Sequence, residues 1–269
     1  MFDIGPDLLT FSYVAYIFIF LCGLILGSFL NSWIWRTREN IQIISSGSFS
    51  ICPCCRRQLV WYEKFPILSY MFLRGKCRTC HKPIPWHFTA VELVTPILLL
   101  SVSLYFLDDI HFSEWYLLRD VLFLTFLIII FVYDALYQEV LSRIVWPGFF
   151  LGSLINYFAL NYSFSSLIIG AAVGGGFFLL QYFISKGRWI GGGDVRLGFM
   201  IGVWLGWPNI LVALFVAYIL GAVVSVGLLI GKKKQWASEI PFGTFLAVGT
   251  FVALYYASGI INWYLGLLR

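Results

Sequence analysis

Two aspartates lie at the borders of long apolar runs. Asp134 follows the apolar run of residues 122–133, and Asp194 directly precedes another at 195–206. A carboxylate within or at the edge of a membrane span is costly and marks a candidate functional site. Two carboxylates brought together cannot both ionise easily, so the pair shares a proton and can activate a water molecule and protonate a leaving amine. This pair therefore predicts aspartic-protease chemistry.

A glycine run precedes Asp194, and glycines allow a tight turn and the close approach of an extended substrate. The run consists of Gly191, Gly192 and Gly193. Structural roles are the alternative for both acids. Asp194 could be a helix N-cap, and Asp134 could pair with Arg143 or Arg196. Spacing alone leaves both interpretations open.

The elements that must position these residues are membrane helices. The 269-residue chain is 60% hydrophobic and 12% charged, with a mean hydropathy of +0.87, whereas soluble domains are about 25% charged. In hydrocarbon an apolar run must satisfy its own backbone, so these runs predict helices. We expect an all-α polytopic membrane protein with about eight spans, and six or seven are alternatives because 195–206 is short. The predicted spans lie near 11–35, 90–107, 117–133, 145–161, 166–185, 195–206, 208–230 and 242–265.

The charges orient these spans. Arginines and lysines gather in loops on one side of the eight-span arrangement, which the positive-inside rule makes cytoplasmic. Residues 36–89 then form a cytoplasmic loop, and both termini lie outside. The first span has no basic leading region or cleavage site, so we expect it to be retained. The predicted division is a first helix at 1–35, the loop at 36–89 and a membrane domain at 90–269.

Four cysteines in this loop have the spacing of a metal site. Two Cys-x2-Cys pairs are separated by 21 residues, and such pairs place four thiolates at the corners of a tetrahedron, which suits zinc. The four residues are Cys52, Cys55, Cys77 and Cys80. A reducing cytosol disfavours disulfides. We therefore expect a structural zinc ion that staples a loop too short to bury a core of its own.

Several blocks, in order along most of the chain, resemble the bacterial type IV prepilin peptidase family. They include the glycine–x–glycine–Asp site and a cysteine loop framed by short motifs. The blocks are Gly27-Ser28-Phe29-Leu30-Asn31, Trp61-Tyr62-Glu63, Pro66-Ile67-Leu68-Ser69-Tyr70, Leu73-Arg74-Gly75-Lys76, Val91-Glu92-Leu93 and the run at 191–197.

The resemblance implies that Asp134 and Asp194 are the catalytic aspartates of an enzyme in the bacterial inner membrane. Its substrates would be prepilins or pseudopilins, cut after a glycine at the cytoplasmic face of the bilayer. Many members also methylate the new amino terminus with S-adenosylmethionine, an activity associated with the zinc loop. Residues that could serve methyl transfer or leader binding are Glu63, Arg74, Lys76 and Glu92. For the two glutamates, an ion pair within the Arg-rich loop is an equal alternative.

Two departures from the family pattern bear on these expectations. Leu141-Ser142 stand where Pro-Asp is frequent, and Lys64 replaces a frequent Asn, which bears more on methylation than on cleavage. A peptidase whose zinc loop is only a scaffold, an ion transporter using both aspartates, and a non-enzymatic assembly platform are the alternatives. The net charge of +5 comes from the loops and does not indicate nucleic-acid binding. The oligomeric state stays open.

Overall fold

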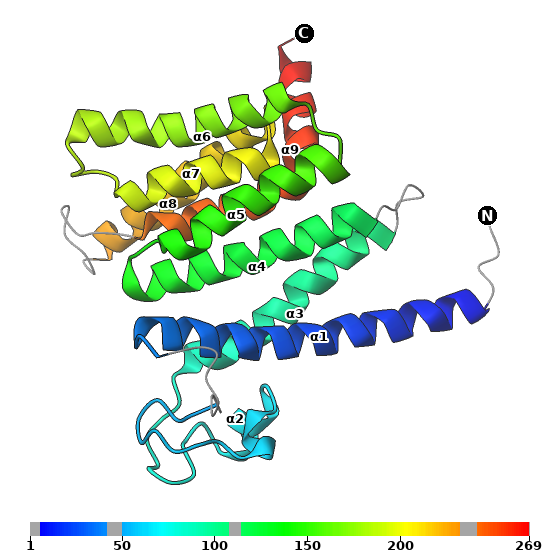
Figure 1. Cartoon of the computed structure of the whole chain (residues 1–269), viewed down its shortest axis with the longest axis vertical. Coiled ribbons are helices and arrows are strands. Elements are labelled where there is room, and N and C mark those ends of the chain that lie inside the picture. The colour runs from blue at the N-terminus through cyan, green and yellow to red at the C-terminus, as the bar shows by residue number, and fades with distance from the viewer. Residues whose placement is uncertain (1–5, 42–49, 108–113, 232–240, 269) are drawn as a thin grey trace. The chain divides into compact units, whose positions relative to one another are not determined.

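A computed structural model describes residues 6–41, 50–107, 114–231 and 241–268. The chain divides into two compact units, an N-terminal unit of residues 1–112 and a C-terminal unit of residues 113–269. The described residues form helices and turns, with isolated β-bridges and no strand, which confirms the all-α fold (Figure 1). The second long helix, Trp86–Leu107, belongs to the first unit, whereas the sequence suggested a boundary at residue 90. The functional division of the chain stays a prediction.

The N-terminal unit pairs two long helices, α1 (Pro6–Arg38) and α3 (Trp86–Leu107). Glycines allow these helices to approach closely. A Cβ atom at Gly23 would lie 2.5 Å from the Cα atom of Pro96, and one at Gly27 would lie 3.0 Å from the Cα atom of Glu92. The Asn31 side-chain amide also donates to the Phe88 carbonyl at 2.7 Å. Close packing of this kind is typical of helix pairs within membranes.

Between these helices the chain forms two similar knuckles and two short helices, η1 (Trp61–Lys64) and α2 (Leu68–Phe72). The Cys52 amide donates to the Arg57 carbonyl at 2.9 Å, and the Cys77 amide donates to the Lys82 carbonyl at 3.0 Å. Each knuckle turns through a residue with positive φ. These residues are Arg56 and His81, at 56° and 55°. The two Cys-x2-Cys sequences therefore fold as a matched pair.

The C-terminal unit is a bundle of helices around α7 (Gly192–Leu205). Its other helices are α4 (Glu114–Tyr137), α5 (Ser142–Leu154) with its π-helical extension η2 (Ile155–Ala159), α6 (Phe164–Ser185), α8 (Asn209–Ile230) and α9 (Phe242–Leu267). Met200, Ile201 and Trp204 on α7 are fully buried. This helix holds Asp194 at its start, so the core of the unit positions one of the candidate acids.

Small residues bring α6 against α7. A Cβ atom at Gly202 would lie 2.3 Å from the Gly170 carbonyl oxygen, and one at Gly198 would lie 2.5 Å from the Gly174 carbonyl oxygen. Both helices therefore present a glycine every four residues at the same contact. Larger side chains at these positions would separate the helices.

Six described helices are long and apolar enough to cross a membrane, namely α1, α3, α4, α6, α8 and α9. The segments predicted near 145–161 and 195–206 are helical, but α5 and α7 contain only 13 and 14 residues. At about 1.5 Å per residue, 14 residues extend roughly 21 Å, less than the ~30 Å hydrocarbon core. By length and composition six of the described helices qualify as membrane spans, and the shorter helices α5 and α7 accompany them in the bundle of the C-terminal unit.

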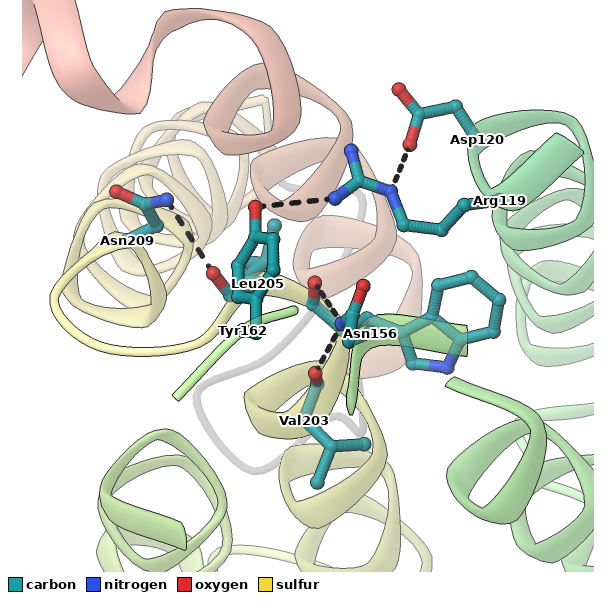
Figure 2. A network of polar contacts seen from close by, with 8 residues as sticks. Arg119, Asp120, Asn156, Tyr162, Val203, Leu205 and Asn209 are labelled. Carbon is teal, nitrogen blue, oxygen red and sulfur yellow. Dashed lines mark hydrogen bonds and ion pairs between the residues drawn. The ribbon is translucent and has the colours of Figure 1, made fainter. Parts of the chain in front are cut away.

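Figure 2 shows the polar groups that close one end of the bundle. The Arg119 guanidinium contacts the Asp120 carboxylate at 2.6 Å and donates to the Tyr162 hydroxyl at 3.3 Å. The Asn156 amide, from η2, donates to the carbonyls of Val203 and Trp204 at 2.7 and 3.0 Å. The last carbonyls of a helix lack partners within that helix. Asn156 therefore caps the end of α7 that is opposite Asp194.

Candidate active site and metal centre

Asp134 lies in the last turn of α4 and is buried. Its Oδ2 atom accepts a hydrogen bond of 2.8 Å from the amide of Thr244, in the first turn of α9. A helix N-terminus has free amides and a partial positive charge, so it stabilises a carboxylate. The position next to Thr244 must be small, because a Cβ atom at Gly243 would lie 2.9 Å from Asp134 Oδ2.

Asp194 is the third residue of α7, and Gly191 is the N-cap. Asp194 is therefore not the N-cap that the structural alternative proposed. Its carboxylate stays close to the start of its own helix, since a Cβ atom at Gly191 would lie 3.8 Å from Asp194 Oδ2.

The two aspartates come together where α4 ends and α7 and α9 begin. Val140 links these ends: a Cβ atom at Gly193 would lie 2.9 Å from Val140 Cβ, and one at Gly243 would lie 3.4 Å from Val140 Cγ2. The Asp194 carboxylate interacts electrostatically with that of Asp134. Two acids that are 60 positions apart in the chain thus lie near the same helix ends and form the candidate acidic pair.

The described part of the chain has no salt bridge from Asp134 to either arginine that the structural alternative named. Arg196 instead donates to the Ser142 hydroxyl and to the Gly192 carbonyl. The Asp134 carboxylate is held by neutral backbone amides and interacts electrostatically with a second carboxylate, so a cation does not fix its charge. Such an arrangement can share a proton and activate water.

The three glycines before Asp194 differ in their surroundings. Gly193 contacts Val140, as described above, whereas a Cβ atom at Gly192 would meet nothing within 4 Å. Gly191 and Gly192 are exposed. The open side of this run leaves room for another backbone beside the acidic pair.

The four predicted metal ligands converge in the N-terminal unit. One sulfur atom from each of Cys52, Cys55, Cys77 and Cys80 lies within 4.8 Å of the others. A tetrahedral ion with Zn–S bonds of about 2.3 Å needs sulfurs roughly 3.8 Å apart. The cluster can therefore hold one metal ion with small side-chain adjustments, and the exposed Cys54 is not part of it.

The thiols of the cluster differ in pKa. Backbone hydrogen bonding from Cys80 lowers the pKa of the Cys77 thiol to about 6, whereas burial raises the pKa of Cys52 to about 12. One thiolate thus forms near neutral pH, whereas the Cys52 thiol keeps its proton until a cation replaces it.

The two candidate glutamates, Glu63 in the loop and Glu92 in α3, have different surroundings in the structure. Glu63 is buried and accepts from Arg57 at 2.6 Å and from the Val60 amide at 3.1 Å. The Arg57 guanidinium holds the pKa of Glu63 below its usual value. Glu63 thus has the ion pair that the sequence left open. Glu92 Oε2 accepts from the Ile67 amide at 2.9 Å and lines a cavity. Arg74 and Lys76 are exposed.

Sequence reasoning missed Thr244, Gly243 and Val140. The contribution of Thr244 is a backbone amide, which every residue except proline offers. The only available signal was Pro241 before a new apolar run, which marks a helix start where an anion can bind.

Comparison with known proteins identifies the class. Residues 21–106 match the bacterial peptidase A24 N-terminal domain, and residues 121–226 match the type IV leader peptidase family. Each match falls within one compact unit. The chain is therefore a multi-pass membrane peptidase.

Three relatives, each named prepilin leader peptidase/N-methyltransferase, align along most of the chain. That of Bacillus subtilis is 32% identical over 249 residues, with 92% of this chain and 96% of the relative covered. That of Aeromonas hydrophila is 30% identical, with 80% and 74% covered. That of Pseudomonas aeruginosa is 28% identical, with 91% of each covered. No solved structure gives a significant match.

The chain belongs to the type IV leader peptidase family. This membership confirms the resemblance and the enzyme class, and it favours an enzyme over the transporter and the assembly platform.

Proposed function

We propose that this protein is an aspartyl endopeptidase that removes the short basic leader of type IV prepilins or pseudopilins, after a glycine, and then methylates the new amino terminus. The observation that carries the peptidase part is the convergence of Asp134 and Asp194 beside an open glycine run. The names of the relatives supply the substrate class and the second activity.

In the proposed mechanism the two aspartates share one proton. Asp134, stabilised by the start of α9, takes a proton from water as the water oxygen bonds to the scissile carbonyl carbon. Asp194 gives its proton to the leaving amine as the carbon–nitrogen bond breaks. The exposed glycines, Gly191 and Gly192, accept the extended substrate segment. After the step one carboxyl is again protonated and the other ionised.

We place both sites at the cytoplasmic face of the bacterial inner membrane, with both termini outside. Asp134 ends α4, whereas Asp194 and Thr244 begin α7 and α9, so all three lie at one end of the bundle. The basic residues of the knuckle loop and Arg143, Lys186 and Arg188 fall on that side in the eight-span arrangement. A prepilin with a cytosolic leader and a membrane helix would then meet the acids at the bilayer surface.

For the N-terminal unit we propose a structural zinc ion on Cys52, Cys55, Cys77 and Cys80, because four thiolates leave no open position for catalysis. S-adenosylmethionine, when bound, supplies an electrophilic methyl group. That chemistry would transfer the methyl group to the new terminal amine, with loss of one amine proton and release of S-adenosylhomocysteine.

The test is cleavage of a purified prepilin by the full-length protein in lipid, with mass spectrometry of the product. We expect Asp134→Asn and Asp194→Asn each to lower the rate by about 100- to 10,000-fold, without a matching loss of thermal stability. Glu114→Gln is the matched control, because Glu114 is an exposed acid at the other end of α4. A gain of one methyl group on the cleaved product supports the second activity.

If both Asn variants cut at the wild-type rate, the aspartyl mechanism is wrong. If the wild type cuts but adds no methyl group, the peptidase-only alternative replaces the two-activity proposal.

A further inference from the structure

The N-terminal unit contains a cavity of about 150 Å³ that the peptidase mechanism does not use. Its walls come from α1, the knuckles, α2 and α3. Whole ligand pockets usually measure about 300–1,000 Å³, so this cavity has room for the reacting end of a ligand and not for a large ligand in full. Its lining includes Ser28, Trp35, Tyr70, Phe88 and Glu92.

Glu92 is the unpaired acid of this cavity. The described residues of the unit contain three glutamates, and two of them contact arginine: Glu39 with Arg56 at 3.2 Å and Glu63 with Arg57 at 2.6 Å. Glu92 has no such partner among the described residues. Its carboxylate accepts from the Ile67 amide and from the Ser28 side chain.

The backbone is strained to hold Glu92. Ile67 adopts φ 60° and ψ −50°, close to a γ-turn, and a positive φ is rare for a β-branched residue. This conformation belongs to the residue whose amide binds Glu92 Oε2 at 2.9 Å. Strain of this kind collects at ligand sites, where the surrounding structure must impose it.

The cationic residues on the lining are Arg57, Lys64 and Arg78, and none of them forms a salt bridge with Glu92. Arg57 is paired with Glu63, and Arg78 donates to the Tyr62 hydroxyl. Aromatic rings from Trp35, Tyr70 and Phe88 also line the cavity. Aromatic faces and an unpaired carboxylate together favour a small organic cation.

We propose that Glu92 is the counter-ion for an organic cation bound in this cavity: the sulfonium of S-adenosylmethionine or the new terminal ammonium of the cleaved substrate. The proposal rests on the methyl transfer proposed above and locates it in the N-terminal unit. Glu92 acts here as a binding residue that holds the positive end of the ligand next to Phe88 and Tyr70. Glu63 supports the cavity through Arg57.

Two probes that differ in charge test the sulfonium. S-adenosylmethionine carries a positive sulfur, whereas S-adenosylhomocysteine has a neutral thioether and lacks the methyl group. We expect the full-length protein in lipid to bind S-adenosylmethionine about tenfold more tightly in equilibrium dialysis, a preference typical of one partly desolvated charge pair. Glu92→Gln should remove the preference, Glu92→Asp should restore part of it, and the control Glu39→Gln should keep it.

A second pair of probes tests the ammonium: the cleaved peptide with a free or an acetylated amino terminus. If Glu92→Gln keeps the sulfonium preference and loses the preference for the free amine, the ammonium is the bound cation. A thermal unfolding midpoint and a metal content at wild-type values show that Glu92→Gln is folded.

If Glu92→Gln keeps both preferences while the wild type methylates its product, the counter-ion proposal alone is wrong. If the wild type cleaves but neither binds S-adenosylmethionine nor methylates, the proposed second activity fails, and this inference fails with it.

Discussion

The helix α4 carries a buried acid near each end, and the surroundings of the two acids are opposite. Asp120 is 1% exposed and contacts Arg119 at 2.6 Å. Asp134, about 21 Å along the helix by the ~1.5 Å rise per residue, is 4% exposed and meets the Thr244 amide and a second carboxylate. A cation fixes the charge at one end, whereas at the other a proton can be gained or lost. Burial alone therefore does not identify a catalytic acid, because the partner of the carboxylate decides whether its charge can change.

The largest effect on stability is expected at the ion-paired end. Asp120→Asn leaves the Arg119 charge buried without its counter-ion, which costs about 3–5 kcal/mol. We expect a marked drop in the unfolding midpoint, with cleavage by the remaining folded protein close to normal. Thermal unfolding in lipid and cleavage per folded molecule measure the two quantities separately.

The double variant Arg119→Leu/Asp120→Leu is the control, because it removes both charges and should recover much of the stability. If Asp120→Asn is as stable as the wild type but loses cleavage, Asp120 takes part in catalysis, and the contrast between a structural Asp120 and a catalytic Asp134 is wrong.

The next effect is expected beside Asp134. Gly243→Ala places a methyl group about 2.9 Å from Asp134 Oδ2, closer than normal contact, so the carboxylate must move. A displacement of about 1 Å in a catalytic group can cost roughly 100-fold. We expect a 10- to 100-fold fall in kcat with a smaller change in KM, measured by prepilin cleavage.

Gly259→Ala is the matched control on the same helix, since a Cβ atom there meets nothing within 4 Å. Equal activity in both variants would mean that the Asp134 position seen here does not matter for cleavage.

The sequence was sufficient for the features that residue type and spacing determine. The apolar runs located the helices, the Cys-x2-Cys pairs located the thiol cluster, and the run borders placed Asp134 at the end of one helix and Asp194 at the start of another. These features are local or depend on chain direction through a bilayer, so they need no tertiary information.

The features that the sequence could not determine depend on backbone geometry and on distant partners. The Thr244 amide has no residue-type signature. The contrast between Glu63 and Glu92 depends on where Arg57 points, which a list of charges does not contain. The span number was ambiguous because apolarity does not distinguish α7, which is buried within protein, from a helix that faces lipid.

The smallest effects on cleavage are expected from substitutions in the glycine run before Asp194. Gly193→Ala brings a methyl group to about 2.9 Å from Val140 Cβ, so α7 must shift slightly at its start. Gly192→Ala meets open space, and its methyl group lies on the side where we place the substrate. We expect Gly193→Ala to lower kcat two- to tenfold. We expect Gly192→Ala to raise KM and to leave kcat nearly unchanged, because a methyl group in the path of the substrate weakens its binding in the ground state and in the transition state equally. Steady-state cleavage over a range of prepilin concentrations measures kcat and KM separately. An unchanged KM for Gly192→Ala would show that the substrate does not pass over this side of the glycine run.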